Sequence, residues 1–191
     1  MEESYVLGNS VLDRQRLETQ TRLFSNYIRA NAKRLVGDEV HSILDLGCGE
    51  GQLGQVLREV YPAAQLVGID KDAAAIGLAR EHAASLHLQN TDFIAADVEQ
   101  ELPAGPFDLA YASTIMMHTH QLAKVVELAQ AALQPGGYLW VKEVYPKVSE
   151  PTSSAEYKEL NTIHPGGPGL RWLLQCQRPV AEDGGLEQSP T

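Results

Sequence analysis

The stretch ILDLGCGEGQLGQVL, residues 43–57, decides the fold. It opens with the apolar run Ile43–Leu46, broken only by Asp45, which predicts a buried strand. The run ends in the loop Gly47–Gly51, and a helical pattern starts near Gln52. Glycines let the backbone turn sharply and approach a ligand without a Cβ in the way. Because ligands of open α/β sheets bind outside the carboxyl ends of the strands, this loop is predicted to belong to a ligand site.

Outward from this stretch, short apolar runs alternate with helical patterns. Strands are predicted at Ile43–Leu46, Gln65–Ile69, Phe93–Ala96, Phe107–Ala112 and Tyr138–Val144. Helices are predicted over 10–36 and near 52–60, 72–85 and 120–133. Strands that alternate with helices form crossover units, which place the strands in parallel. The predicted fold class is therefore α/β, a mostly parallel central sheet with helices on both faces.

The domain organisation follows from the change of texture along the chain. Residues 1–40 are interpreted as a helical lead-in or lid, 41–178 as the ligand-binding domain with its core at 41–145, and 179–191 as a disordered polar tail. After residue 145 the chain is loop-like, with a short helical candidate at 155–163 and a last strand over Leu170–Gln177.

Composition narrows the functional classes. The chain has 191 residues, 43% of them hydrophobic and 21% charged, which is typical of one globular domain. A net charge of −10 opposes binding to nucleic acid or to an anionic membrane, since both need a basic surface. The two cysteines, Cys48 and Cys176, form no metal-binding pattern. With a polar N-terminus and no apolar run of about 18 residues, a cytoplasmic location is expected.

A dinucleotide fingerprint competes for the glycine loop. Residues 49–54, GEGQLG, formally satisfy the pattern GxGxxG. That pattern should begin where the strand ends, however, and the turn already begins at Gly47. Counted from Gly47, the third glycine is Gly51, while Gln52 occupies the position that the fingerprint requires. The spacing therefore disfavours a pyrophosphate site, and the carboxylate of Asp45 before the turn suits a cationic ligand better.

The segment Asp45–Gly51 resembles the first motif of class I, Rossmann-like, S-adenosylmethionine (SAM)-dependent methyltransferases. The resemblance implies that the loop, with Asp45, Gly47, Cys48, Gly49 and Gly51, wraps the methionine end of the cofactor. It assigns the ribose hydroxyls to Asp70, 23 residues after Gly47, with Lys71 beside it. It assigns the adenine ring to the side chain of Asp97 and the backbone of Val98. On its own, an acidic residue at the position of Asp70 suits NAD equally well.

Two further segments extend the resemblance to the end of the predicted core. The fourth strand ends at Ser113, in the family's fourth-motif position at the cleft, and 133–143 (LQPGGYLWVKE) matches the family's fifth strand. The lead-in YVLGNSVLDRQRLETQ resembles that of some small-molecule methyltransferases, in which a tyrosine and a helix pack over the cofactor. The matching positions are Tyr5, Arg16, Leu17 and Gln20.

Two histidines are candidate general bases. His118 and, second, His120 follow the fourth strand at the predicted cleft edge. Their competing interpretation is a pair of helix-start residues that face water. No nearby carboxylate or third ligand completes a metal site, so no metal is predicted.

The predicted function is methyl transfer from SAM to oxygen or nitrogen of a small-molecule acceptor. A nucleic-acid acceptor is disfavoured because Ser113-Thr114-Ile115-Met116 stands where many nucleobase methyltransferases carry Asn/Asp-Pro-Pro-Tyr. The C-terminal part is shorter than in the family, where a helix and two strands, one of them antiparallel, follow the fifth strand; here RWLLQCQRP is the candidate for the antiparallel strand. A short C-terminal part has three possible consequences: an open acceptor side, a homo- or hetero-oligomer through this side, or loss of activity. The alternatives are a non-catalytic SAM-binding partner protein and a nicotinamide-dependent oxidoreductase.

Overall fold

The computed structural model describes residues 11–144 and 171–177. The elements in chain order are α1 (Val11–Val36), β1 (Ser42–Leu46), α2 (Gln52–Val60), β2 (Gln65–Asp70), α3 (Ala73–Ser85), β3 (Thr91–Ala95), β4 (Phe107–Ser113), the short 3₁₀ helix η1 (Met116–His118), α4 (Leu122–Ala132), β5 (Leu133–Val144) and β6 (Arg171–Gln177). The predicted strands and helices are confirmed within a few residues at their ends, except that β5 begins at Leu133, five residues before the predicted Tyr138 and directly after α4. The helix candidate at 155–163, Tyr5 and the tail 179–191 lie outside the described residues.

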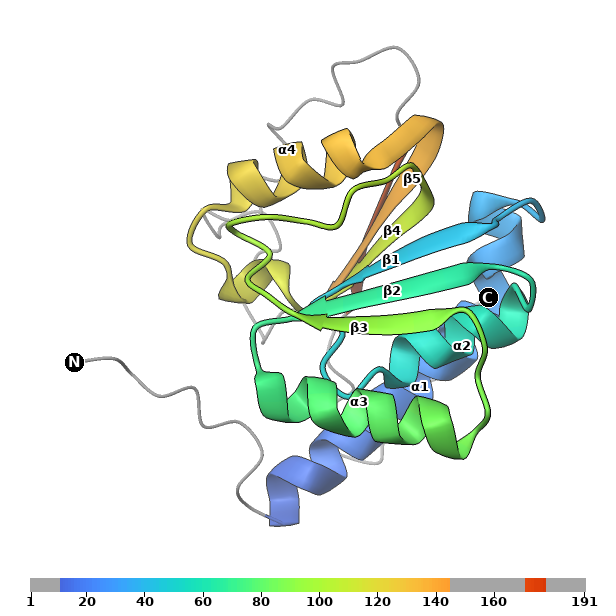
Figure 1. Cartoon of the computed structure of the whole chain (residues 1–191). Helices are drawn as coiled ribbons and strands as arrows, with labels where there is room; N and C mark the ends of the chain where they lie inside the picture. Colours follow the sequence, from blue (N-terminus) through green and yellow to red (C-terminus); the bar gives the residue numbers. More distant parts are fainter. Residues whose placement is uncertain (1–10, 145–170, 178–191) are drawn as a thin grey trace, which may run out of the picture.

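The strands form one sheet in the order β3-β2-β1-β4-β5-β6, with every neighbouring pair parallel (Figure 1). The predicted α/β class with a parallel sheet is confirmed. The expectation that the last strand is antiparallel is wrong, because β6 pairs with β5 in parallel, from Tyr138 opposite Arg171 to Val144 opposite Gln177. The connection 145–170 exceeds the dozen or so residues that a parallel crossover requires.

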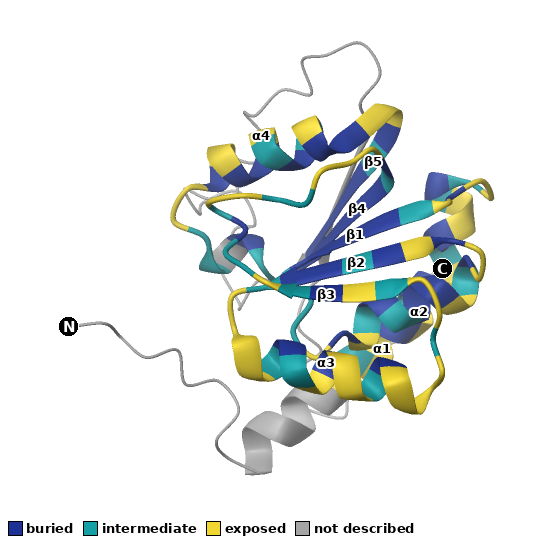
Figure 2. Ribbon diagram, viewed as in Figure 1, coloured by how far each residue is buried: buried dark blue, intermediate teal, exposed yellow. Residues whose placement is uncertain are grey.

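Helices cover both faces of the sheet. On one face, α1, α2 and α3 enclose a core that includes Ile28, Leu57, Ile76 and Trp140 (Figure 1). On the other face, α4 packs over a second cluster that includes Val125 and the strand residues Leu44, Ala110 and Val141. Figure 2 shows the central strands almost wholly buried, whereas β3 at the edge has one buried residue, Phe93, among exposed and half-buried ones. The near-continuous apolar runs of β1 and β4 follow from this double coverage.

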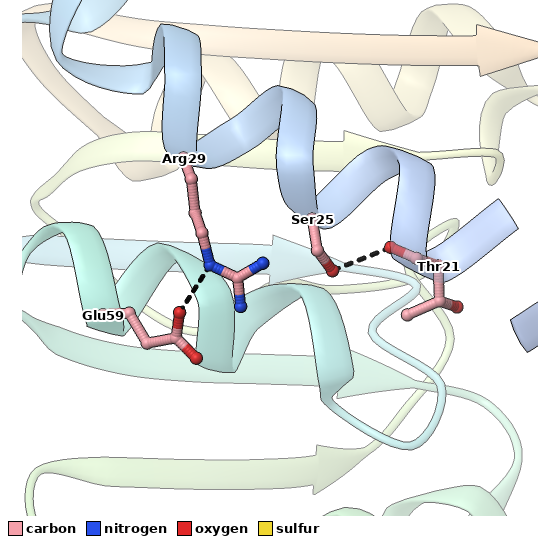
Figure 3. Close-up of polar contacts among 4 residues, drawn as sticks. All are labelled: Thr21, Ser25, Arg29 and Glu59. Atoms are coloured by element: carbon pink, nitrogen blue, oxygen red, sulfur yellow. Dashed lines mark hydrogen bonds and ion pairs between the residues drawn. The ribbon is translucent and has the colours of Figure 1, made fainter. Parts of the chain in front are cut away.

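The second half of α1 is part of the core. Ile28 and Ala32 are fully buried against the sheet. Arg29 on the outer side forms an ion pair with Glu59 of α2 at 2.8 Å (Figure 3). The ammonium of Lys142, on β5, lies over the ring of Phe24, which joins α1 to the carboxyl half of the sheet. Within the described part of the chain, no helix is long and apolar enough to cross a membrane.

Candidate functional site

A cavity of about 260 Å³ lies at the carboxyl ends of the parallel strands. The loops after β1, β2, β3 and β4 form its wall, as expected for an open α/β sheet. Its lining residues are Gly47, Gly49, Asp70, Lys71, Asp72, Ala75, Asp97, Val98, Glu99, Ser113, Thr114, Ile115, His118 and Thr119.

The glycine loop holds a backbone shape that only glycine adopts without strain. Gly47, Gly49 and Gly51 have φ angles of 66°, 53° and 77°. The N–H groups of Gly47 and Cys48 both donate to the carbonyl of Ile69 on β2, at 2.8 and 3.0 Å. These bonds fix the loop on the end of the neighbouring strand and turn its inner surface toward the cavity.

A Cβ added at each glycine meets a different environment. At Gly51 it would come within 2.8 Å of the Phe93 ring, and at Gly47 within 2.7 Å of the Ile115 side chain. At Gly49 it would meet nothing within 4 Å. Gly51 and Gly47 are therefore required for packing, while Gly49 leaves open space beside the cavity for a ligand.

Gly54, the last glycine of the formal dinucleotide pattern, has a packing role. A Cβ on this residue would lie 2.7 Å from Oδ2 of Asp45 and 3.0 Å from Leu66. The glycine is needed for close packing of α2 against β1 and β2. Its presence is therefore explained without a pyrophosphate site.

Asp45 is a carboxyl group buried beneath the loop. It is 2% exposed, and its Oδ2 has no hydrogen-bond partner among the described residues. Burial, followed by the nearby charge of Asp70, raises the pKa of Asp45 to about 7. A cation bound above the loop would favour the ionised form of this carboxyl group.

Asp70 is held at the cavity by two backbone donors. Its Oδ2 accepts the N–H of Gly49 at 2.9 Å, and its Oδ1 accepts the N–H of Asp72 at 2.9 Å. Each carboxylate oxygen has a second lone pair, which leaves both able to accept hydroxyl hydrogens from a ligand. The side chain of Asp72 caps α3 instead, accepting the N–H of Ala74 at 2.9 Å.

The loop after β3 presents an acidic turn. Oδ1 of Asp97 accepts the N–H of Glu99 at 2.9 Å, and the carbonyl of Asp97 accepts the N–H of Gln100 at 2.9 Å. The side chain of Glu99 in turn accepts the backbone N–H of His120 from the loop after β4. Val98, between them, is buried against the α4 face of the sheet.

The loop after β4 forms another part of the cavity wall. Ser113 is only 9% exposed, and its Oγ has no hydrogen-bond partner in the described part of the chain. Thr114 has a φ of 54°, which is rare for a β-branched residue, and its N–H donates to the carbonyl of Lys142 at 2.8 Å. This turn directs the chain into η1, where His118 lines the cavity.

His118 is poised as a neutral imidazole. Its pKa is lowered from 6.5 by burial first and by the positive charge of Lys71 second. A neutral imidazole accepts a proton at neutral pH. Among the described residues, no group of three His, Cys, Asp or Glu side chains forms a metal site.

The predicted site residues separate into two groups. Gly47, Gly49, Asp70, Lys71, Asp97, Val98, Ser113 and His118 lie together in the cavity wall. Asp45 and Gly51 are buried behind it, His120 is exposed, and Gln20 is half-buried on α1. Cys48 packs behind the loop, where burial and the charges of Asp45 and Asp70 raise the pKa of its thiol far above the usual range.

Sequence reasoning missed several residues of the wall, among them Glu99, Thr114 and Ile115. The short distance of Glu99 from Asp97 was a signal for its place in the loop. Nothing in the sequence signals that its side chain contacts His120, because the two residues follow different strands.

The comparisons with known proteins come from sequence and from structure. A family model described as "Methyltransferase domain" matches residues 38–176. The trans-aconitate 2-methyltransferase of Azoarcus sp. (strain BH72) is 31% identical over 105 residues, which cover 55% of this chain and 40% of the relative. The ubiquinone biosynthesis O-methyltransferase of Acinetobacter baumannii (strain ACICU) is 30% identical over 121 residues, which cover 62% of this chain and 49% of the relative. The chain therefore spans about half the length of these relatives, or less.

Two solved structures share the fold. The [4+2]-cyclase SpnF matches with a TM-score of 0.59 and 27% identity, over 71% of this chain and 49% of that chain. The plantazolicin methyltransferase BpumL, solved in complex with SAH, matches with a TM-score of 0.60 and 20% identity, over 76% of this chain and 57% of that chain. The likeness to BpumL shows the fold alone.

Proposed function

The chain belongs to this methyltransferase-domain family, and from that premise we propose that it transfers a methyl group from SAM to a small-molecule acceptor. The observation that carries the proposal is the glycine loop joined to Asp70 by the Gly49 hydrogen bond at the cavity wall. SAM supplies an activated methyl group on a sulfonium, so the protein needs chiefly to bind, orient and exclude water.

The residues present fit this cofactor. Gly49 leaves the space that a ligand backbone or carboxylate needs. Among the described residues, the buried Oγ of Ser113 in the cavity wall has no hydrogen-bond partner. Buried polar atoms are normally hydrogen-bonded, so such an atom in a cavity wall is suited to a ligand. The acidic side chains of Asp45, Asp70 and Asp97 also favour a cationic cofactor over a diphosphate.

Each part of the wall has a proposed role. Gly47, Gly49 and Ser113 would contact the methionine end, with Asp45 below them as counter-charge and Cys48 and Gly51 shaping the loop. Asp70 and Lys71 would bind the ribose side. Asp97 and the backbone of Val98 would bind the adenine. Gln20 and Tyr5 would cover the cofactor.

His118 is the proposed general base. Its lowered pKa keeps the imidazole neutral at neutral pH, the form that accepts the proton of a hydroxyl or ammonium acceptor. His120 is the second candidate, although its backbone N–H is already held by Glu99.

The relatives and the net charge support a small-molecule acceptor. The relatives are named trans-aconitate 2-methyltransferase and ubiquinone biosynthesis O-methyltransferase, and the net charge of −10 opposes nucleic acid. An oligomer through the C-terminal side is also proposed, to be tested by light scattering. A cytoplasmic location is likewise proposed.

Calorimetric titration with SAM and, separately, with NAD tests the proposal. We expect micromolar binding of SAM that weakens at least about tenfold in Asp70→Ala, since a charge-assisted hydrogen bond contributes about 1.5–3 kcal/mol. The exposed Asp38, at the far end of α1, supplies the control Asp38→Ala. Binding of NAD instead, or SAM binding unaffected by Asp70→Ala, would overturn the proposal. SAM binding without turnover on any acceptor would favour the non-catalytic alternative.

A further inference from the structure

Two loops that follow different strands both line the cavity. The first, after β3, carries Asp97, Val98 and Glu99, and the second, after β4, carries Thr114 to Thr119. In the proposed function the first loop binds the adenine and the second holds the candidate base His118. A contact between them would relate cofactor binding to the position of the base.

The side chain of Glu99 makes such a contact. Its Oε1 accepts the backbone N–H of His120, two residues after His118. Local hydrogen bonds hold Glu99 itself and the turn that precedes His120. The N–H of Glu99 donates to Oδ1 of Asp97 at 2.9 Å, and the N–H of His118 donates to the carbonyl of Ile115 at 2.9 Å.

The amino end of α4 adds a reason for the carboxylate to stay there. Gln121, the N-cap residue, makes no side-chain cap, and the first turn of the helix carries no acidic residue. The positive end of the helix dipole therefore lacks a negative group from its own segment. Glu99 supplies that negative charge from the loop after β3, because its carboxylate accepts the N–H of His120, the residue before the N-cap.

We propose that Glu99 is a positioning residue, which holds the turn 115–120 and its His118 against the cavity and relates the position of this turn to occupancy of the adenine side. Asp97 contacts the proposed cofactor and is one hydrogen bond from Glu99, so a ligand that orders Asp97 also orders the turn. The second part of this inference rests on the proposed function.

Amide hydrogen exchange tests the hydrogen bond without any acceptor. In Glu99→Ala we expect the amides of residues 118–122 to exchange about tenfold faster or more, because a charge-assisted hydrogen bond is lost. Glu99→Gln keeps an acceptor oxygen and should restore most of the protection. The control Glu101→Ala, at an exposed glutamate of the same loop, should match the parent protein. Unchanged exchange in Glu99→Ala, or equal acceleration throughout the sheet, would overturn the proposal.

The same measurement with S-adenosylhomocysteine, the product form of the cofactor, tests the coupling. We expect this ligand to slow exchange over 115–122 in the parent protein and to lose that effect in Glu99→Ala while still protecting the glycine loop. If it binds the parent protein without slowing exchange there, the coupling is wrong. If it does not bind, the proposed function fails and the coupling with it, whereas the unliganded exchange still decides the role of Glu99.

Discussion

Replacing Asp45 by asparagine should stabilise the ligand-free protein at alkaline pH. Asp45 lies on β1 with 2% of its surface exposed, and one of its oxygens has no partner among the described residues. Its pKa is raised to about 7, chiefly by burial. The folded protein therefore pays a free-energy penalty to ionise this group, and asparagine, with almost the same shape, removes the charge.

The sign and size of this effect follow from the link between the pKa of Asp45 and the pH dependence of stability. Between pH 4 and pH 7 the folded state keeps a proton on Asp45 that the unfolded chain has released, so stability falls as pH rises through this window. One pKa unit corresponds to about 1.4 kcal/mol. A rise from 3.8 to about 7 thus makes the folded state up to about 4 kcal/mol less stable at pH 8 than at pH 4 through this group alone. Asp45→Asn should recover part of this loss.

Thermal and urea unfolding of ligand-free protein at pH 5, 6, 7 and 8 measures the effect. We expect Asp45→Asn to melt higher than the parent at pH 8, by up to about 10 °C, and the difference to shrink toward pH 5. The exposed Glu81 on α3 supplies the control Glu81→Gln, which should show no such trend. A variant that is less stable at pH 8, or a difference that does not change with pH, would refute the reasoning. Ligand must be absent because binding raises apparent stability.

The other predictions concern the loop and the base. Gly51→Ala should lower the free energy of unfolding by about 2–3 kcal/mol, since the residue has positive φ and its Cβ would meet Phe93. Gly49→Ala, with open space around it, should cost only about 1 kcal/mol but weaken SAM binding; equal urea midpoints for the two variants would contradict this. His118→Ala should keep SAM affinity and reduce kcat at least about 100-fold. In the parent, kcat should fall only as pH drops below 6.5, because burial and Lys71 lower the pKa of His118; an unchanged kcat in the variant would remove this base.

Much of the fold could be predicted because local signals agreed with the global arrangement. Apolar runs marked the strands, and the loop Gly47–Gly51 marked the carboxyl edge where the cavity lies. The direction of β6 could not be predicted in this way. A strand's residues specify that it is buried, but its direction depends on the path of the connection, here 145–170. The antiparallel expectation came from the family resemblance and not from the residues.

The site was less predictable wherever it depends on contacts between distant segments. That Asp70 reaches the cavity follows from its place at the end of β2. The orientation of its carboxylate by the N–H groups of Gly49 and Asp72 could not be predicted, because it depends on the geometry of the loop. The left-handed backbone of Thr114 had no signal either, because a threonine gives no reason to expect positive φ. Its N–H continues the ladder of β4 by donating to the Lys142 carbonyl on β5, and the chain turns toward η1 at this residue.

Two aspartates on adjacent strands show how the ends of this sheet differ. Asp108, at the amino end of β4, accepts the N–H groups of His41 and Ser42 at 2.7 and 2.8 Å, and the Ser42 hydroxyl at 3.0 Å. It joins β4 to β1, so its carboxylate is satisfied by the fold itself. Asp45, on β1 near the carboxyl end, has an oxygen that the described residues leave without a partner. In the proposed function a cationic cofactor above the loop would favour the ionised form of Asp45. We therefore expect Asp45→Asn to stabilise the ligand-free protein and to weaken SAM binding.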